Sequence, residues 1–561
     1  MSQGGSGITG QHQHTQPSPA QRQASAYPQQ GYATQHPQNQ GQGQPDGARS
    51  AQADQHARQA AQSPQQTLAR YTGCLLGGAV GDALGAPIEF MSATDILLDF
   101  GPMGVTNYQP AYGGLGLITD DTQMTLFTAD GLLRAWIEGH STHAQSQSRG
   151  HDRPQHHGHP QEHDHSPERN HSPEHSHSQT HGHALNPVRT TALAYLHWLQ
   201  TQGESPALSL DPALHGWLFA QEALHARRAP GMTCLSSLRS MDTLGAPARN
   251  NSKGCGGVMR VAPVGLFAHS LHLKPQQTFQ LGNRLAGLTH GHPTGQLTGG
   301  ALAVFIQGLA GGVALRNCLP PVKALLRATP DHEETLHAIE QAESLAGSDL
   351  PHAEAIKRLG QGWIAEEALA VSLYCALVAQ DFKHGVKLAV NHDGDSDSTG
   401  AIAGNLLGAL YGESAIPAKW LQPLELRGVI TEVARDLHDF HDWQLDGAHA
   451  DAALAQRLRA RYPVQPARRP AVWHLPTTNP HNHEDSLASP AQRAHNPHIC
   501  EDFTLLVTPI APDPHDHEDY DVLLSSFTQN PHNREDFSCR SASTTPPRSV
   551  RSSAPPARPS T

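Results

Sequence analysis

The sequence predicts an all-α protein, in which one large helical domain carries disordered segments before, within and after it. Apolar residues recur with helical spacing through seven segments, and no convincing alternation of polar and apolar residues predicts a strand. Hydrophobic residues make up 37% of the 561 residues and aromatic residues 5%, which is low for a chain that folds throughout. The helical segments are 71–84, 124–136, 191–199, 281–288, 297–309, 364–378 and 400–411.

Three low-complexity segments mark the limits of the folded domain. Residues 1–67 are rich in Gln, residues 141–184 are rich in His, and residues 463–561 are rich in Pro, Ser and Arg. Such compositions bury too little apolar surface to offset the entropy of ordering the chain. We therefore expect residues 68–462 to form one domain with a disordered His-rich insertion. Weak zinc, copper or nickel binding and a tolerated loop are both open interpretations of that insertion.

The C-terminal tail contains a repeat of 17 residues. Its four units begin with Asn-Pro-His or Asp-Pro-His at residues 479, 496, 513 and 530, and each continues to a Glu-Asp pair. The units share no apolar pattern that could build the core of a solenoid. They are interpreted as short linear motifs or as a duplicated segment, with no assigned mechanism.

Charge and cysteine usage narrow the classes of function. The net charge is −13 and the pI is about 6.3, which argues against a nucleic-acid-binding or membrane-surface protein. No signal peptide is visible at the N-terminus, and the longest apolar stretch, 301–315, is too short to span a bilayer. The seven cysteines include no Cys-x-x-Cys motif and suggest reduced thiols. The expected location is the cytoplasm, without membrane contact.

The first acidic motif is Thr119-Asp120-Asp121, which stands directly before an apolar helical segment. Thr119 is a plausible N-cap, so both aspartates would lie in the first helical turn. Compensation of the helix dipole alone would explain two acids at this position.

The second acidic motif contains Asp393, Asp395 and Asp397, which alternate before another helix and are followed by Ser398. Alternating aspartates are typical of a calcium loop of the EF-hand type, but the required Gly and Glu positions do not fit either register. The helix that follows is rich in Gly and Ala, which allows close approach to neighbouring helices.

A third acid, Glu89, ends a Gly-rich apolar segment. If Glu89, the two aspartates before the first helix and Asp395 and Asp397 converge, each close pair of carboxylates repels by about 1 to 4 kcal/mol, depending on the effective dielectric. Such a cluster requires cations to stay ionised. Carboxylate and hydroxyl oxygens suit magnesium or manganese better than zinc.

A glycine-rich segment, 250–260, is a candidate anion site. Its glycines would let backbone N–H groups approach an anion, and Lys253 and Arg260 would add positive charge. A purely structural turn is the alternative, and no base marks Cys255 as a nucleophile. His290 is expected to contact substrate or to be a core histidine.

Six motifs, taken together and in order, resemble the ADP-ribosylglycohydrolase family. The resemblance covers the expected domain and none of the low-complexity segments. It implies an orthogonal all-α bundle with a two-magnesium site, for which manganese is a possible substitute. The motifs are GCLLGGAVGDALGAPIEF, TDDTQMT, NNSKGCGGVMRVAPVGL, LTHGHPTG, GWIAEEALAVSLYC and GDSDSTGAIAGNLLGALYG.

The resemblance also implies roles for individual residues. The departures from the family pattern are Ser398, where many relatives carry Thr, and Asp393, which is often a small residue. Glu89 resembles a family glutamate near the second metal, and His290 would hold the ADP-ribose. The implied metal ligands are Thr119, Asp120, Asp121, Asp395, Asp397 and Ser398, and the implied diphosphate-binding residues are Ser252, Lys253, Gly254, Cys255 and Gly256.

The implied function is magnesium-dependent hydrolysis of the bond between the distal ribose and a modified protein. Two cations would orient the sugar and activate water, and Asp120 or Glu89 would take the proton from that water. Two alternatives remain: a hydrolase of free ADP-ribose derivatives or nucleotide-sugars on the same fold, and a non-enzymatic, crystallin-like structural protein. The sequence predicts neither the modified amino acid nor the oligomeric state.

Overall fold

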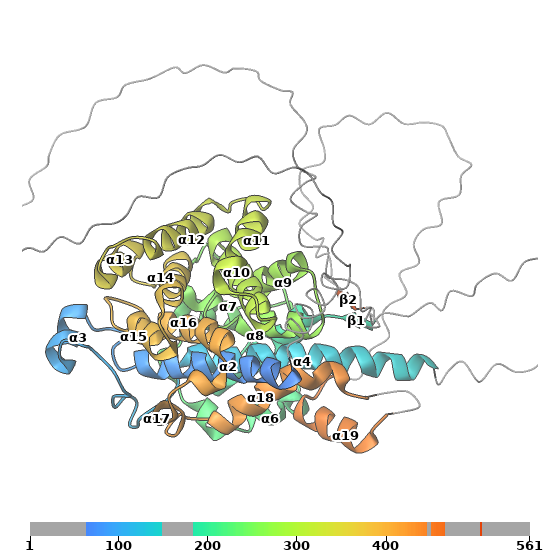
Figure 1. Cartoon of the computed structure of the whole chain (residues 1–561). Coiled ribbons are helices and arrows are strands. Elements are labelled where there is room, and N and C mark those ends of the chain that lie inside the picture. Colours follow the sequence, from blue (N-terminus) through green and yellow to red (C-terminus); the bar gives the residue numbers. More distant parts are fainter. Residues whose placement is uncertain (1–62, 148–182, 446–449, 466–504, 508–561) are drawn as a thin grey trace, which may run out of the picture. The chain divides into compact units, whose positions relative to one another are not determined.

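The computed structural model describes residues 63–147, 183–445, 450–465 and 505–507 (Figure 1). Within these ranges helices are almost the only regular secondary structure, which confirms the predicted all-α class. The first helices are α2 (Pro64–Gly85), α3 (Ala93–Phe100), α4 (Asp120–Gln147), α5 (Pro187–Thr201), α6 (Gly216–Phe219), α7 (Met232–Arg239), α8 (Ala262–Ser270), α9 (Pro275–Gly287) and α10 (Pro293–Ala310). The others are α11 (Leu315–Arg327), α12 (Glu333–Ala346), α13 (His352–Leu359), α14 (Ala365–Val378), α15 (Phe382–Val390), α16 (Ser396–Tyr411), α17 (Ala418–Leu421), α18 (Arg427–Asp439) and α19 (Ala452–Arg461).

Short elements complete the described chain. The 3-10 helices are η1 (Pro212–Leu214), η2 (Glu222–His225), η3 (Cys255–Gly257), η4 (Glu413–Ala415) and η5 (Phe440–Asp442). Two three-residue strands that the sequence did not predict, β1 (His183–Leu185) and β2 (Leu505–Val507), pair antiparallel. No helix in the described part of the chain is long and apolar enough to cross a membrane.

Helices α2 and α16 form the most extensive contact between any two elements of the described chain. They approach through glycines: a Cβ atom added at Gly77 would overlap the carbonyl oxygen of Gly404, and one added at Gly404 would overlap the carbonyl oxygen of Gly77. Gly73 and Gly408 meet in the same reciprocal way. Because only glycine leaves room for a backbone at this distance, the two helices are held in one register.

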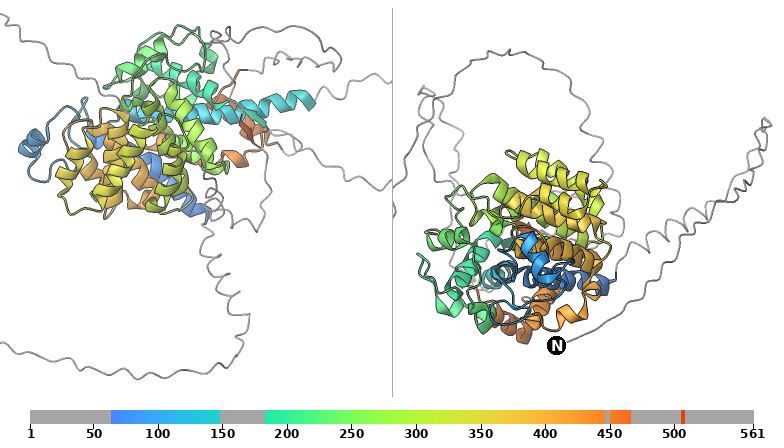
Figure 2. Two further views of the ribbon diagram at one scale, coloured as in Figure 1. Left: turned by 90° about the horizontal axis from the view of Figure 1, so that it is seen from above. Right: turned by 90° about the vertical axis from the view of Figure 1, so that its left-hand side faces the viewer.

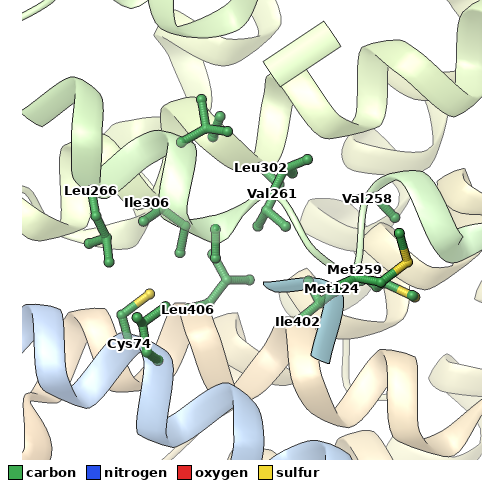
Figure 3. Packing of buried hydrophobic residues seen from close by; sticks show 14 of the residues in the cluster. Cys74, Met124, Val258, Met259, Val261, Leu266, Leu302, Ile306, Ile402 and Leu406 are labelled. Carbon is green, nitrogen blue, oxygen red and sulfur yellow. The ribbon is translucent and has the colours of Figure 1, made fainter. Parts of the chain in front are cut away.

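The apolar core lies where α2, α4, α8, α10 and α16 meet (Figure 3). Cys74 of α2 and Leu406 of α16 lie on one side, and Leu266 and Ile306 face them from α8 and α10 (Figure 3). All four side chains are buried. The other helices pack around this centre, while α3 stands at the edge of the bundle in the views of Figures 1 and 2.

All seven helical segments predicted from the sequence lie within helices or their capping residues. The first helix of the described chain begins before residue 68, the expected start of the domain. Helix α2 begins at Pro64 because Ser63 and Gln66 form a capping box and proline is favoured in the first turn. The predictions for the Gln-rich segment, the His-rich insertion and the 17-residue repeats fall almost entirely outside the described residues.

Candidate active site

Two helix N-termini bring the aspartates of the two acidic motifs together. Asp120 and Asp121 are the first residues of α4, whereas Asp395 caps α16 and Asp397 lies in its first turn. All four carboxylates are buried. Burial and the charge of Asp397 raise the pKa of Asp120 and of Asp121 well above the usual range. Carboxylates from motifs far apart in the sequence therefore face one another.

Hydrogen bonds within α16 hold the second pair of aspartates. The backbone N–H of Ser398 donates to Oδ1 of Asp395 at 3.2 Å and to Oδ1 of Asp397 at 3.0 Å. The hydroxyl of Ser398 lies 3.7 Å from the sulfur of Met259. Burial raises the pKa of Asp397, and the neighbouring Thr119 side chain is one of the smaller effects that oppose this rise. The start of α4 therefore lies close to the start of α16.

Asp82 is a buried member of the acidic cluster that the sequence analysis missed. Its carboxylate, near the end of α2, accepts the backbone N–H of Thr119 at 3.0 Å and that of Thr122 at 3.1 Å. It also accepts both threonine hydroxyls. Asp82 thus satisfies N–H groups at the start of α4 from a different helix. Thr119, the predicted cap, accepts the N–H of Asp121 at 3.4 Å and donates its hydroxyl to Asp82. Asp82 lies within the Gly-rich apolar segment that ends at Glu89, but no spacing relative to the other acidic residues distinguished it in the sequence.

Glu89 follows the C-terminal end of α2 and completes the cluster. Burial, together with the charges of Asp397 and Asp395, raises the pKa of Glu89 to about 10. Oε2 of Glu89 and Oδ1 of Asp121 are buried without a hydrogen-bond partner among the described residues. An ionised carboxylate with an unpartnered buried oxygen is costly unless a cation neutralises it.

The fit of the cluster to divalent cations depends on its donor atoms and on its charge. As the side chains stand, no group of three or more His, Cys, Asp or Glu side chains within the four described ranges could hold a metal ion. The donor set nevertheless consists of carboxylate and hydroxyl oxygens, which hard cations prefer. The two unpartnered oxygens and the mutual repulsion of the carboxylates are both features that cations would relieve. The oxygen ligands and the charge of these residues therefore suit magnesium or manganese.

The glycine-rich loop lies against the start of α16. The thiol of Cys255 donates to Oδ2 of Asp395 at 2.8 Å, and the backbone N–H of Cys255 donates to the carbonyl of Trp363 at 3.2 Å. Ser252 stands at the other end, where its hydroxyl accepts the Gly254 N–H at 3.3 Å. A Cβ atom at Gly256 would crowd the ring of His290 and the sulfur of Cys234, so this position requires glycine.

The two basic residues of the loop are occupied by internal partners. Nζ of Lys253 pairs with Glu366 of α14 and with Glu334 of α12, the latter at 2.8 Å. Arg260 is fully buried, and its guanidinium donates to Tyr195 at 2.9 Å and to Thr289 at 2.6 Å. The positive charge that the sequence predicts beside the loop is therefore already paired or buried.

His290 lies beneath the loop and is buried. Nδ1 of the ring lies 2.8 Å from the hydroxyl of Thr289. Burial and the nearby charge of Arg260 lower the pKa of His290 to about 3. The neutral ring of His290 therefore packs against the glycines of the loop.

Asp393, which departs from the family pattern, does not join the acidic cluster through any described hydrogen bond. Its Oδ1 accepts the backbone N–H of Ala93, the first residue of α3, at 2.7 Å. The bond ties the segment that follows Glu89 to the segment that precedes Asp395.

A cavity of about 350 Å³ lies beside the loop. Its polar lining residues are three serines of helix α7 and its C-cap, together with Asp242, Arg249 and Asn250.

Comparison with known proteins gives one family. The sequence model of ADP-ribosylglycohydrolases matches residues 63–446. The chain is 26% identical to an uncharacterized protein of Archaeoglobus fulgidus, over 66% of this chain and 97% of that protein. It is 25% identical to the ADP-ribosyl-dinitrogen reductase glycohydrolase of Rhodospirillum rubrum, over 66% of this chain and 94% of the relative. It is 22% identical to the ADP-ribosylarginine hydrolase Tri1 of Pseudomonas putida, over 67% of this chain and 80% of the relative.

Proposed function

Because this chain belongs to the ADP-ribosylglycohydrolase family and is therefore a glycosidic-bond hydrolase, we propose that it removes ADP-ribose from modified proteins in a magnesium-dependent reaction. The bond cleaved would join the distal ribose to the modified side chain. The observation that carries this proposal is the convergence of buried carboxylates from α4, α16 and the end of α2. A purely structural, crystallin-like role would not require them.

The proposed metal ligands are the residues at the two helix N-termini. When bound, two divalent cations would neutralise the carboxylates, orient the ribose hydroxyls and lower the pKa of water. Manganese could replace magnesium because the donors are oxygens throughout. The ligand set is Thr119, Asp120, Asp121, Asp395, Asp397 and Ser398.

Glu89 and Asp120 are the two candidate bases. Oδ2 of Asp120 accepts the backbone N–H of Gly231 at 3.2 Å, whereas Oε2 of Glu89 has no partner among the described residues. A base needs a free oxygen to receive a proton. We therefore propose that Glu89 accepts the proton of the attacking water and that Asp120 has an orienting role. Negative charge from the cluster would stabilise the oxocarbenium-like transition state.

The glycine-rich loop formed by Ser252, Lys253, Gly254, Cys255 and Gly256 is proposed to hold the diphosphate. The backbone N–H groups of Lys253 and Gly256 would be the donors, because those of Ser252, Gly254 and Cys255 donate to Asn250, Ser252 and Trp363. Lys253 would contribute its backbone rather than its charge, because Glu334 and Glu366 pair with the ammonium group. His290 would hold the loop in shape against the ADP-ribose.

The test is release of ADP-ribose by the full chain. Peptides ADP-ribosylated on arginine and on serine are each incubated with magnesium, with manganese and with a chelator, and the products are identified by mass spectrometry. We expect free ADP-ribose and unmodified peptide from at least one substrate, and no release with the chelator. Absence of release from both peptides, or release that the chelator does not affect, would overturn the proposal.

A further inference from the structure

Exposed apolar side chains gather around the acidic cluster. In the described part of the chain ten large apolar side chains are exposed: Phe90, Leu97, Leu98, Met103, Tyr112, Leu115, Met232, Val313, Trp363 and Tyr411. Six of these lie in the segment between α2 and α4, which contains Glu89. Four adjoin groups of the candidate site, and we call Phe90, Tyr112, Met232 and Trp363 the apolar rim.

Two rim residues follow site residues directly in the sequence. Phe90, of which 76% is exposed, comes immediately after Glu89. Met232, of which 68% is exposed, comes immediately after Gly231, whose N–H donates to Asp120. The N–H of Gly231 ties the backbone before Met232 to the cluster, while the side chains of both rim residues are largely exposed.

The other two rim residues approach the cluster from other parts of the fold. The carbonyl of Trp363 accepts the N–H of Cys255, whose thiol donates to Asp395. Tyr112 is half-buried, and the charge of Glu89 adds to burial in raising the pKa of its hydroxyl. The guanidinium of Arg228 lies 5.8 Å from the centre of the Tyr112 ring.

The aromatic rings of Phe90 and Trp363 stack on each other. Their ring centres are 5.8 Å apart and their planes differ by 17°, so the two aromatic faces are nearly parallel. One ring comes from the segment after α2 and the other from the segment before α14. A pair of exposed aromatic rings is unusual on a solvent-facing surface and is typical of a binding surface.

We propose that the apolar rim binds the polypeptide segment that carries the ADP-ribosylated residue. This inference rests on the proposed function and names the part of the substrate that the acidic cluster does not hold. The glycosidic bond must reach the acidic cluster to be cleaved. The polypeptide that lies on the other side of this bond from ADP-ribose must therefore extend out of the site over the apolar rim. A polypeptide has backbone and neighbouring side chains to pack on aromatic and Met side chains there, whereas a free ADP-ribose derivative does not.

The test compares a peptide with its modified amino acid alone. The substrates are an ADP-ribosylated peptide that the wild-type chain hydrolyses and the corresponding ADP-ribosylated single amino acid. The variants are Phe90→Ala, Trp363→Ala and the double variant. Tyr411→Ala is the matched control, because Tyr411 is an exposed aromatic residue at the far end of α16 from the cluster. Melting temperatures establish that each variant is folded.

We expect the double variant to raise the KM for the peptide about tenfold, as for the loss of aromatic anchors at other interfaces, with kcat little changed. Both constants for the modified amino acid should stay within about twofold of wild type, as should all constants of the control. An equal loss on both substrates, or an unchanged KM for the peptide, would overturn the rim proposal alone. A wild-type chain that hydrolyses neither compound would overturn the proposed function, and the rim proposal with it. If Trp363→Ala lowers the melting temperature, Phe90→Ala decides the matter by itself.

Discussion

The thiol of Cys255 lies 2.8 Å from Oδ2 of Asp395 and donates a hydrogen bond to it. Burial and the charge of Asp395 raise the pKa of this thiol well above its usual range, so the sulfur stays protonated. A protonated thiol is a poor nucleophile but a usable donor. We therefore expect Cys255 to position a carboxylate of the candidate site rather than to attack substrate.

Substitutions at Cys255 test whether its thiol acts as a hydrogen-bond donor or only fills space. Cys255→Ala removes a hydrogen bond to a charged acceptor, for which the usual loss is about 1.5 to 3 kcal/mol, or tenfold or more in kcat/KM. Cys255→Ser keeps a donor and should remain much closer to wild type. Steady-state kinetics of both variants check this expectation. An alanine variant with the wild-type rate would show that the hydrogen bond does not matter.

Asp120→Asn and Asp395→Asn should each abolish hydrolysis while helical content, measured by circular dichroism, is retained. An amide oxygen is a poorer ligand for a hard cation than a carboxylate. Each change also removes one charge from a mutually repelling cluster. Without magnesium the variants should therefore melt at or above the wild-type temperature.

The same two variants should differ from wild type in their response to magnesium. Excess magnesium should raise the melting temperature of the wild type by mass action and raise that of the variants less. Wild-type protein whose melting temperature ignores magnesium, or an Asp395→Asn variant with normal turnover, would contradict the proposed metal site.

Stability of the metal-free chain should fall as the pH rises. The pKa of Glu89 is raised from 4.5 to about 10 by burial first and then by neighbouring carboxylates, so the folded state binds its proton more tightly than the unfolded state does. The stabilisation from this proton is complete below pH 4.5 and is lost as the pH rises toward 10. Denaturant unfolding of the wild type and of Glu89→Gln at pH 5, 7 and 9 checks this. The variant should lose less stability over the series, and equal losses would contradict the assignment.

The glycine contact between α2 and α16 should tolerate no side chain. A Cβ atom at Gly404 would overlap the Gly77 carbonyl, and overpacking of this kind destabilises proteins by about 1 to 3 kcal/mol or more. Gly404→Ala should lower the free energy of unfolding and also the activity, because α16 carries Asp395 and Asp397. Gly428→Ala in α18 is the control, since a Cβ atom there meets nothing within 4 Å. That variant should be as stable as wild type or slightly more stable.

Removal of both flanking segments should leave hydrolysis nearly unchanged, provided that the C-terminal limit is placed correctly. The shortened chain 63–465 keeps the carbonyl of Pro463, which accepts a hydrogen bond from the buried guanidinium of Arg134. It also keeps Gln465, whose Oε1 accepts from Arg189 at 3.1 Å. The chain 63–462 lacks both acceptors and should melt at a lower temperature. Loss of most turnover in the folded 63–465 chain would contradict this expectation.

Local patterns in the sequence predicted the fold class well. Helical periodicity placed α2, α4, α5, α9, α10, α14 and α16, because an amphipathic or buried helix is encoded within a few turns of its own residues. Periodicity did not reveal the start of α2, since the cap at Ser63 lies inside a Gln-rich stretch that resembles the segment before it. The strand pair was not predictable, because β1 and β2 are three residues long and far apart in the chain.

By itself the sequence determined the helices and the acidic turns at the start of α4 and α16, because periodicity and the preference of acids for helix N-termini act locally. Only the tertiary structure decided which charges are free. The ammonium group of Lys253 is neutralised by Glu334 and Glu366, which are 81 and 113 residues away. Asp82 accepts the N–H groups of Thr119 and Thr122 because packing brings α2 against the N-terminus of α4. These pairings depend on the register in which glycine contacts hold α2 against α16, and no local pattern encodes that register.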